Sequence, residues 1–129
     1  MIEVHGEQVR LVLPTTPHLL RVARLTAAGL AGRLGFSFDE IEDVKIAVDE
    51  LCFALVGSRG RPGSLALTYT LEVGALLIEG VATYEGSPPE LAPTDLSSQI
   101  LAAVVDDHEL ASDGDRLRFR LVKHRGGAE

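Results

Sequence analysis

Few side chains in this chain could take part in chemistry, and most of them lack the partners that chemistry needs. Glu50 is an acidic residue set among apolar ones, so it is either a carboxylate of a functional site or a charged residue at a helix boundary. Cys52, in the same apolar stretch, is interpreted as a small buried hydrophobic residue. Ser97 and Ser98 have no histidine paired with them, so neither is assigned a nucleophilic role. The histidines do not have the spacing of metal ligands and are expected on the surface or in the core: His5, His18, His108 and His124.

Two arginines offer a candidate binding face rather than a reactive group. Arg21 and Arg24 have the i, i+3 spacing of neighbours on one side of a helix, which is predicted over residues 17–34. Both lie largely outside the apolar side of this helix. That side is broad, and it consists of Leu19, Leu20, Ala23, Ala27, Leu30, Ala31 and Leu34. The two arginines are therefore either a solvated face or part of a surface that binds a partner.

The helix that carries Glu50 is the best-specified element of the sequence. The stretch Phe38–Val56 has apolar residues at the i, i+3, i+4, i+7 spacing of one helical face, namely Ile41, Val44, Val48, Leu51 and Leu55. Ser37 precedes it and Glu40 follows three residues later, which is the spacing of a capping box. We therefore predict a core helix over 38–56.

The remaining pattern predicts strands joined by tight turns around these helices. The predicted elements are a strand over 3–13, helices over 17–34 and 38–56, strands over 64–73 and 75–83, a short helix over 96–105 capped by Thr94 or Asp95, and strands near 108–112 and over 116–122. Because consecutive strands are close in sequence, we expect a mixed, mostly antiparallel sheet with the helices on one face. The fold class is thus α/β, more narrowly an α+β two-layer sandwich of order β-α-α-β-β-α-β-β.

The composition limits the classes of function. A chain of 129 residues with 46% hydrophobic and 24% charged residues fits one globular domain, expected to span 1–129. A net charge of −7 leaves no basic stripe for phosphates, so direct binding of nucleic acid is not expected. A single cysteine rules out an internal disulfide, and neither a membrane span nor a signal peptide is visible. We therefore expect a cytoplasmic protein.

The string D-x-x-x-A-V-x-E-x-C in the second helix resembles the N-box helix of the anti-sigma factor serine kinases. These are the sigma-B and sigma-F regulators of the histidine-kinase-like ATPase superfamily. The pattern is matched by Asp43, Ala47, Val48, Glu50 and Cys52. The order of elements also matches over roughly residues 5–123, strongly over 36–52 and weakly elsewhere. The resemblance implies the histidine-kinase-like ATPase fold and a degenerate member of the actinobacterial type.

Three nucleotide motifs of that family are altered in this sequence. The N-box asparagine, which holds Mg²⁺, is replaced by Ala54, which has no oxygen ligand to offer. The adenine-binding D-x-G-x-G motif aligns with Ala82 at the aspartate, Tyr84 at the first glycine and Gly86 at the second. The phosphate-binding G-x-G-L motif aligns with Asp95-Leu96-Ser97-Ser98, where an aspartate would repel a triphosphate. We therefore expect neither ATP nor Mg²⁺ as a cofactor, and no metal site.

The resemblance implies a binding protein of transcription regulation. We expect an anti-sigma factor that binds a sigma factor and an anti-anti-sigma factor, with Arg24 at a basic partner-binding position of the family and Arg21 beside it, and that forms a homodimer through the first helix. An acidic chain suits the basic regions of a sigma factor. The alternative is an active ATP-dependent serine kinase that phosphorylates the anti-anti-sigma factor, with Glu50 as its catalytic base. A third possibility is a domain of this fold with another regulatory partner.

Overall fold

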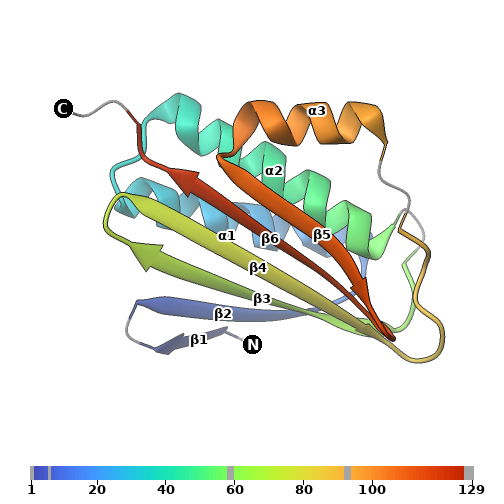
Figure 1. Ribbon diagram of the computed structural model, residues 1–129. Coiled ribbons are helices and arrows are strands. Elements are labelled where there is room, and N and C mark those ends of the chain that lie inside the picture. Colours follow the sequence, from blue (N-terminus) through green and yellow to red (C-terminus); the bar gives the residue numbers. More distant parts are fainter. Residues whose placement is uncertain (1, 6, 58–59, 92–93, 127–129) are drawn as a thin grey trace.

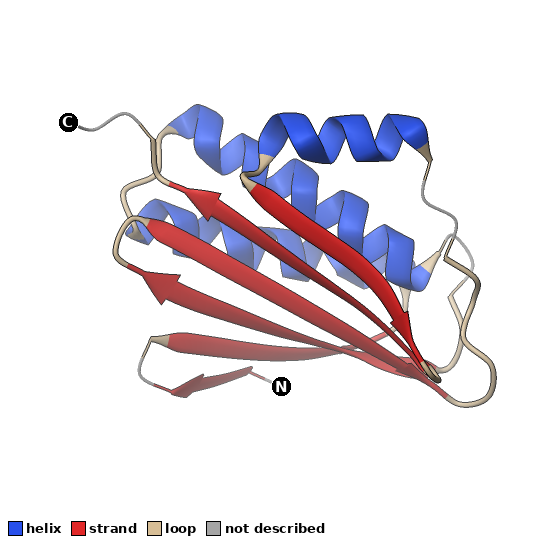
Figure 2. Ribbon diagram, in the orientation of Figure 1, coloured by secondary structure: helices blue, strands red, loops and turns tan. Residues whose placement is uncertain are grey.

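An antiparallel sheet and a layer of helices on one of its faces make up the fold (Figure 1, Figure 2). The computed structural model describes residues 2–5, 7–57, 60–91 and 94–126. The strands are β1 (Ile2–His5), β2 (Gln8–Pro14), β3 (Gly63–Glu72), β4 (Ala75–Tyr84), β5 (Asp107–Asp113) and β6 (Arg116–His124). The helices are the 3-10 turn η1 (Pro17–Leu19), α1 (Leu20–Arg33), α2 (Phe38–Val56) and α3 (Asp95–Val104).

The sheet has the strand order β1-β2-β3-β4-β6-β5, and every pairing in it is antiparallel. Its register aligns the apolar residues of neighbouring strands on one face. In one row Leu11 pairs with Leu67, Leu67 with Gly80 and Gly80 with Phe119. The phenyl ring of Phe119 fills the space over Gly80, where an added Cβ would lie 2.4 Å from Cε2 of that ring. The inner face is thus continuous from β2 to β6.

The core lies between this inner face and the helices. Leu51, Leu55, Tyr69, Ile78 and Leu121 are all fully buried in one hydrophobic cluster. Two tyrosines of the sheet also bind the helices directly. The hydroxyl of Tyr69 on β3 donates to the carbonyl of Ala23 on α1 at 2.9 Å, and that of Tyr84 on β4 donates to the carbonyl of Leu55 on α2. These bonds fix where each helix crosses the sheet.

The capping box predicted for α2 is confirmed. The Ser37 hydroxyl accepts from the Glu40 amide at 3.1 Å, and the Glu40 carboxylate accepts from the Ser37 amide at 2.8 Å. The amide of Gly126 also donates to this carboxylate, at 2.5 Å. Hydrogen bonds from these two amides lower the pKa of Glu40, because they favour its ionised form.

The predicted fold class is confirmed, while two details near the N-terminus differ. The single strand expected over 3–13 is two strands, β1 and β2, which pair with each other. The first helix, expected over 17–34, begins with the 3-10 turn η1, so that α1 starts only at Leu20. The hydroxyl of Thr15, just before this turn, donates to the carbonyl of Arg61 in the loop before β3. Of the two caps predicted for the short helix α3, the structure has Thr94.

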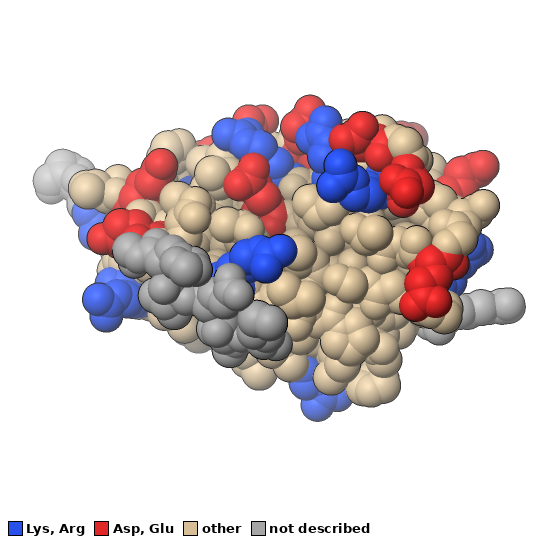
Figure 3. Space-filling model, turned by 90° about the horizontal axis from the view of Figure 1, so that it is seen from below, with Lys and Arg blue, Asp and Glu red and all other residues tan. Residues whose placement is uncertain are grey.

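The helices leave the other face of the sheet open. Figure 3 shows this side of the molecule, where charged side chains gather toward the margins of a broad area without Lys, Arg, Asp or Glu. On the central strand β3 the outward positions before Glu72 carry small residues, Ser64, Ala66, Thr68 and Thr70. The site residues predicted from the sequence do not occupy outward positions of the described strands, so any site they form lies on the helical side. None of the described helices is long and apolar enough to cross a membrane.

Candidate functional site

A groove of about 570 Å³ lies between the second half of α2, the helix α3 and the edge strand β5. Its described lining consists of Glu50, Leu51, Phe53, Ala54, Gly57, Glu90, Thr94, Ser97, Ser98, Leu101, His108, Glu109 and Leu110. Two of the positions singled out in the sequence, Glu50 and Ala54, thus share one groove. The periodicity of α2 explains this, because both residues lie beside the buried stripe of Leu51 and Leu55.

Glu50 is held by a residue of the neighbouring helix. Its Oε1 accepts a hydrogen bond of 2.9 Å from the hydroxyl of Ser97, which links α2 to α3. Ser97 therefore positions a carboxylate. The sequence could not show this bond, because its two residues are 47 positions apart.

The positions aligned with the Mg²⁺-binding asparagine and the adenine-binding aspartate are both alanines, Ala54 and Ala82. Ala54 lines the groove, half-buried, and carries only a methyl group. Ala82, on β4, is fully buried and pairs with Leu65 and Leu117 in the sheet, so it lies in the core beneath the helices rather than in the groove. A carboxylate at Ala82 would be surrounded by apolar residues.

The two other aligned positions lie toward the loop before α3. Gly86 is exposed in that loop with a φ of 104°. Asp95 is the first residue of α3 and is also exposed. The N-terminal end of α3 is already capped, because the Thr94 hydroxyl accepts from the Ser97 amide at 3.0 Å. One amide that a phosphate could otherwise bind is therefore occupied.

The charge of the groove is negative. Its described lining includes Glu50 and Glu90 and neither Lys nor Arg. Glu109 also lines it from β5, but its position between the inward-facing His108 and Leu110 directs its side chain to the outer face of the sheet. Glu109 is partly neutralised by Arg118, whose Nη1 lies 3.5 Å from its Oε1. Neither Glu50 nor Glu90 forms an ion pair with a residue that the structure describes. Such a lining repels a polyphosphate and attracts a cation.

The buried thiol beside this groove is chemically inert. Cys52 is fully buried, as predicted, and burial raises the pKa of its thiol because the thiolate would lose its hydration. Within the described ranges no group of three or more His, Cys, Asp or Glu side chains is placed to hold a metal ion.

The two arginines lie at a second, smaller groove of about 420 Å³ between the start of α1 and α2. Arg21 is exposed there. Arg24 is half-buried, and its Nη1 lies 3.1 Å from Oδ2 of Asp49 on α2. This ion pair joins the two helices, so Arg24 has a partner within the chain. Glu50 and Phe53 line both grooves.

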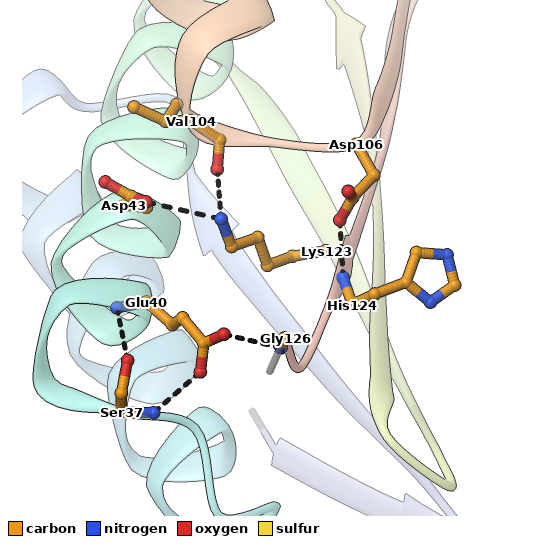
Figure 4. A network of polar contacts seen from close by, with 8 residues as sticks. All are labelled: Ser37, Glu40, Asp43, Val104, Asp106, Lys123, His124 and Gly126. Carbon is orange, nitrogen blue, oxygen red and sulfur yellow. Dashed lines mark hydrogen bonds and ion pairs between the residues drawn. The ribbon is translucent and has the colours of Figure 1, made fainter. Parts of the chain in front are cut away.

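Asp43, another residue of the N-box pattern, belongs to a polar network at the opposite end of α2 (Figure 4). The ammonium of Lys123 on β6 lies 3.2 Å from Oδ2 of Asp43 and donates to the carbonyl of Val104 at 2.8 Å. The Lys123 side chain is only 13% exposed. It binds the last residue of α3, where the partial negative charge of a helix favours a cation. Asp43 thus helps to hold α2, α3 and β6 together.

Comparison with curated proteins decides the family. A serine-protein kinase RsbW of Bacillus thuringiensis is 31% identical over 101 residues, which cover 73% of this chain and 63% of that protein. The RsbW of Bacillus anthracis matches to the same extent. That of Halalkalibacterium halodurans is 38% identical over 66 residues, which cover 50% of this chain and 41% of that protein. The chain belongs to the anti-sigma factor serine kinase family.

No protein-family model matches this member of the anti-sigma factor serine kinases. The chain spans less than two thirds of the length of the Bacillus relatives, 63% of it.

Sequence reasoning missed Phe53 of this family member. Its side chain is 53% exposed although it is large and aromatic, and it lies between the two grooves. A signal was available in the helical periodicity, because position 53 falls outside the stripe formed by Leu51 and Leu55. Because Phe53 lines both grooves, it is a candidate contact residue for a ligand of either one.

Proposed function

We propose that this chain is an anti-sigma factor whose nucleotide site is degraded, and that it acts by binding a sigma factor, an anti-anti-sigma factor, or both. The observation that carries the proposal is the lining of the groove beside Glu50. Where the family's Mg²⁺ ligand would stand it has the methyl group of Ala54, and its described lining has carboxylates without Lys or Arg. Hard Mg²⁺ requires oxygen ligands, and a triphosphate requires compensating positive charge.

Mg-ATP should therefore leave the melting temperature of the protein unchanged. A ligand at a hundred times its Kd stabilises the folded state by about 2.7 kcal/mol. For a chain of this size that corresponds to about 5–12 °C in melting temperature. Differential scanning fluorimetry with and without Mg-ATP measures the shift, and a shift of that size would refute the degraded site.

A control comes from restoring the missing ligand. Ala54→Asn returns an oxygen ligand to a half-buried position with groove space in front of it. The Bacillus thuringiensis relative, measured alongside, shows the response of a protein named as a kinase. Because Ala82 and Asp95 remain unsuitable, we expect Ala54→Asn to stay unresponsive as well. A response of this variant alone would identify position 54 as the sole defect.

An active serine kinase is the alternative function, and two observations favour it. The curated relatives are named as serine-protein kinases, and Glu50, the candidate base, does lie in a groove. Against it, Ala54 offers no oxygen ligand for Mg²⁺, and the described lining of the groove has no Lys or Arg for a triphosphate. The same Mg-ATP titration separates the two functions, because a kinase must bind its nucleotide.

Partner binding is proposed to involve Arg21 and Arg24, which lie on the helical side near Phe53. Charge reversal by Arg24→Glu should weaken binding of the co-purified sigma or anti-anti-sigma factor by about 2 kcal/mol or more, the size of an interface hot spot. The free energy of unfolding should fall by no more than about 1 kcal/mol, because the ion pair with Asp49 is between side chains 36% and 44% exposed. Titration calorimetry and thermal melting measure the two effects.

The double variant Arg24→Asp with Asp49→Arg provides the matched control. It exchanges the two charges and so restores the ion pair between α1 and α2 while leaving the partner surface altered. Weak binding combined with a recovered melting temperature would assign Arg24 to the interface. Full recovery of binding would assign it to the contact between the helices alone.

A homodimer through α1 is also proposed. The structure supports it less than the broad apolar face of the α1 sequence did. The alanines of the apolar face, Ala23, Ala27 and Ala31, are fully buried within the chain itself. On the outer side of α1 the large apolar residue that remains is Leu25, 58% exposed. A cytoplasmic location follows from the proposed partners, and direct binding of nucleic acid is not part of the proposed function.

A further inference from the structure

The groove beside Glu50 combines an apolar wall with negative charge, and the proposed loss of nucleotide leaves it free for another ligand. The wall consists of Leu51, Phe53, Ala54, Leu101 and Leu110, contributed by α2, α3 and β5. Leu51 and Leu101 are buried, whereas the Phe53 ring is more than half exposed. A volume of about 570 Å³ falls within the usual range of ligand sites, so the groove can accept several side chains of a partner.

Two carboxylates without a cationic partner determine which chemistry fits. Glu50 and Glu90 both line the groove, and neither forms an ion pair among the described residues. Glu50 belongs to α2, and Glu90 to the segment that leads to α3, so the charges come from two different parts of the chain. The net charge of −7 adds a long-range attraction for cations.

We propose that this groove binds a cationic, amphipathic peptide segment of a partner protein, with apolar side chains against Phe53 and Leu110 and a Lys or Arg reaching Glu50 and Glu90. This inference rests on the proposed function, because it requires that no nucleotide fills the groove. A small inorganic cation would satisfy the charge but leave the apolar wall uncovered. A peptide that carries both features matches the whole lining.

The probe is a capped peptide of the sequence Ac-ALRALRA-NH2, labelled with a fluorophore and titrated against the full chain. Two matched peptides replace its arginines by glutamate and its leucines by alanine, respectively. The arginine peptide should bind, and its affinity should fall as salt is raised, because exposed charges are screened. Both matched peptides should bind several-fold more weakly.

Substitutions in the protein test whether the peptide binds in this groove. Glu50→Gln and Glu90→Gln remove charge at almost constant shape and should each weaken the arginine peptide by about twofold to fivefold, the range of an exposed ion pair. Phe53→Ala should weaken it by a similar factor through the apolar wall. Glu72→Gln, at the exposed end of β3 and outside both grooves, is the control for net charge and should leave the affinity unchanged.

Three outcomes would overturn the inference. The first is that the arginine peptide does not bind up to millimolar concentration. The second is that Glu72→Gln weakens its binding as much as Glu50→Gln and Glu90→Gln do. The third is that spermine, which has charge without apolar side chains, binds as tightly as the arginine peptide. The failure of the proposed function looks different. Mg-ATP would then raise the melting temperature and displace the bound peptide, whereas a peptide that fails to bind while Mg-ATP has no effect leaves the degraded-site proposal intact.

Discussion

Replacing Ala82 by aspartate should destabilise the protein by about 3–5 kcal/mol, the cost of an uncompensated buried charge. Ala82 is fully buried on β4, and its partners in the neighbouring strands, Leu65 and Leu117, are buried apolar residues. A carboxylate there would lose its hydration and find no cation. The substitution introduces the residue that the predicted alignment with the family's adenine-binding motif places at this position.

The isosteric variant Ala82→Asn separates charge from size. Burial raises the pKa of the new carboxyl in the folded state, so between about pH 4 and that raised value the folded protein holds a proton that the unfolded chain has released. Stability of Ala82→Asp relative to Ala82→Asn should therefore fall as the pH rises through this window and recover in acid. Urea unfolding at several pH values measures the difference. A loss below about 1 kcal/mol at neutral pH would mean that water reaches position 82, as an adenine-binding aspartate requires.

The sequence predicted those elements whose signals are local. The bounds of α2 were predicted to the residue, because the Ser37–Glu40 box, the apolar stripe and the terminal Gly57 all lie within or beside it. The tight turns predicted between strands likewise placed β5 and β6, and Gly114 between these strands has the positive φ of 66° that such a turn needs.

The features that the sequence did not predict depend on contacts between distant residues. The bond of Ser97 to Glu50 and the ion pair of Arg24 with Asp49 join different helices, so no spacing within one helix indicates them. The pairing of β1 with β2 is likewise set by strand register rather than by the pattern within 3–13. The apolar side of α1 was predicted correctly, but whether a sheet or a second copy covers it depends on the packing of the whole chain.

The roles of Glu50, Ala54 and Asp95 stay predictions until nucleotide binding is measured.

Leu51→Ala should cost about 2–5 kcal/mol of folding free energy, because truncating a buried leucine removes apolar contacts and leaves a cavity. Leu51 is fully buried, yet it also lines the groove beside Glu50, so it is shared by the core and the candidate site. Leu96→Ala on α3, whose side chain is 67% exposed, is the matched control and should change stability by less than about 0.5 kcal/mol. Urea unfolding followed by circular dichroism measures both, and an unchanged m-value would show that the unfolded states are comparable.

The size of the Leu51→Ala effect also distinguishes two descriptions of the groove wall. If the wall is rigid core, the cavity persists, the loss lies near the upper end of the range, and the apolar side of the groove deepens without collapse. If α3 can move toward α2, it fills part of the space, the loss lies near the lower end, and the bond between Ser97 and Glu50 is the contact that shifts first. A loss below half a kcal/mol would place Leu51 on the surface and contradict both descriptions. A large loss would mean that α2 holds Glu50 on a rigid support, which any ligand of the groove, nucleotide or peptide, requires.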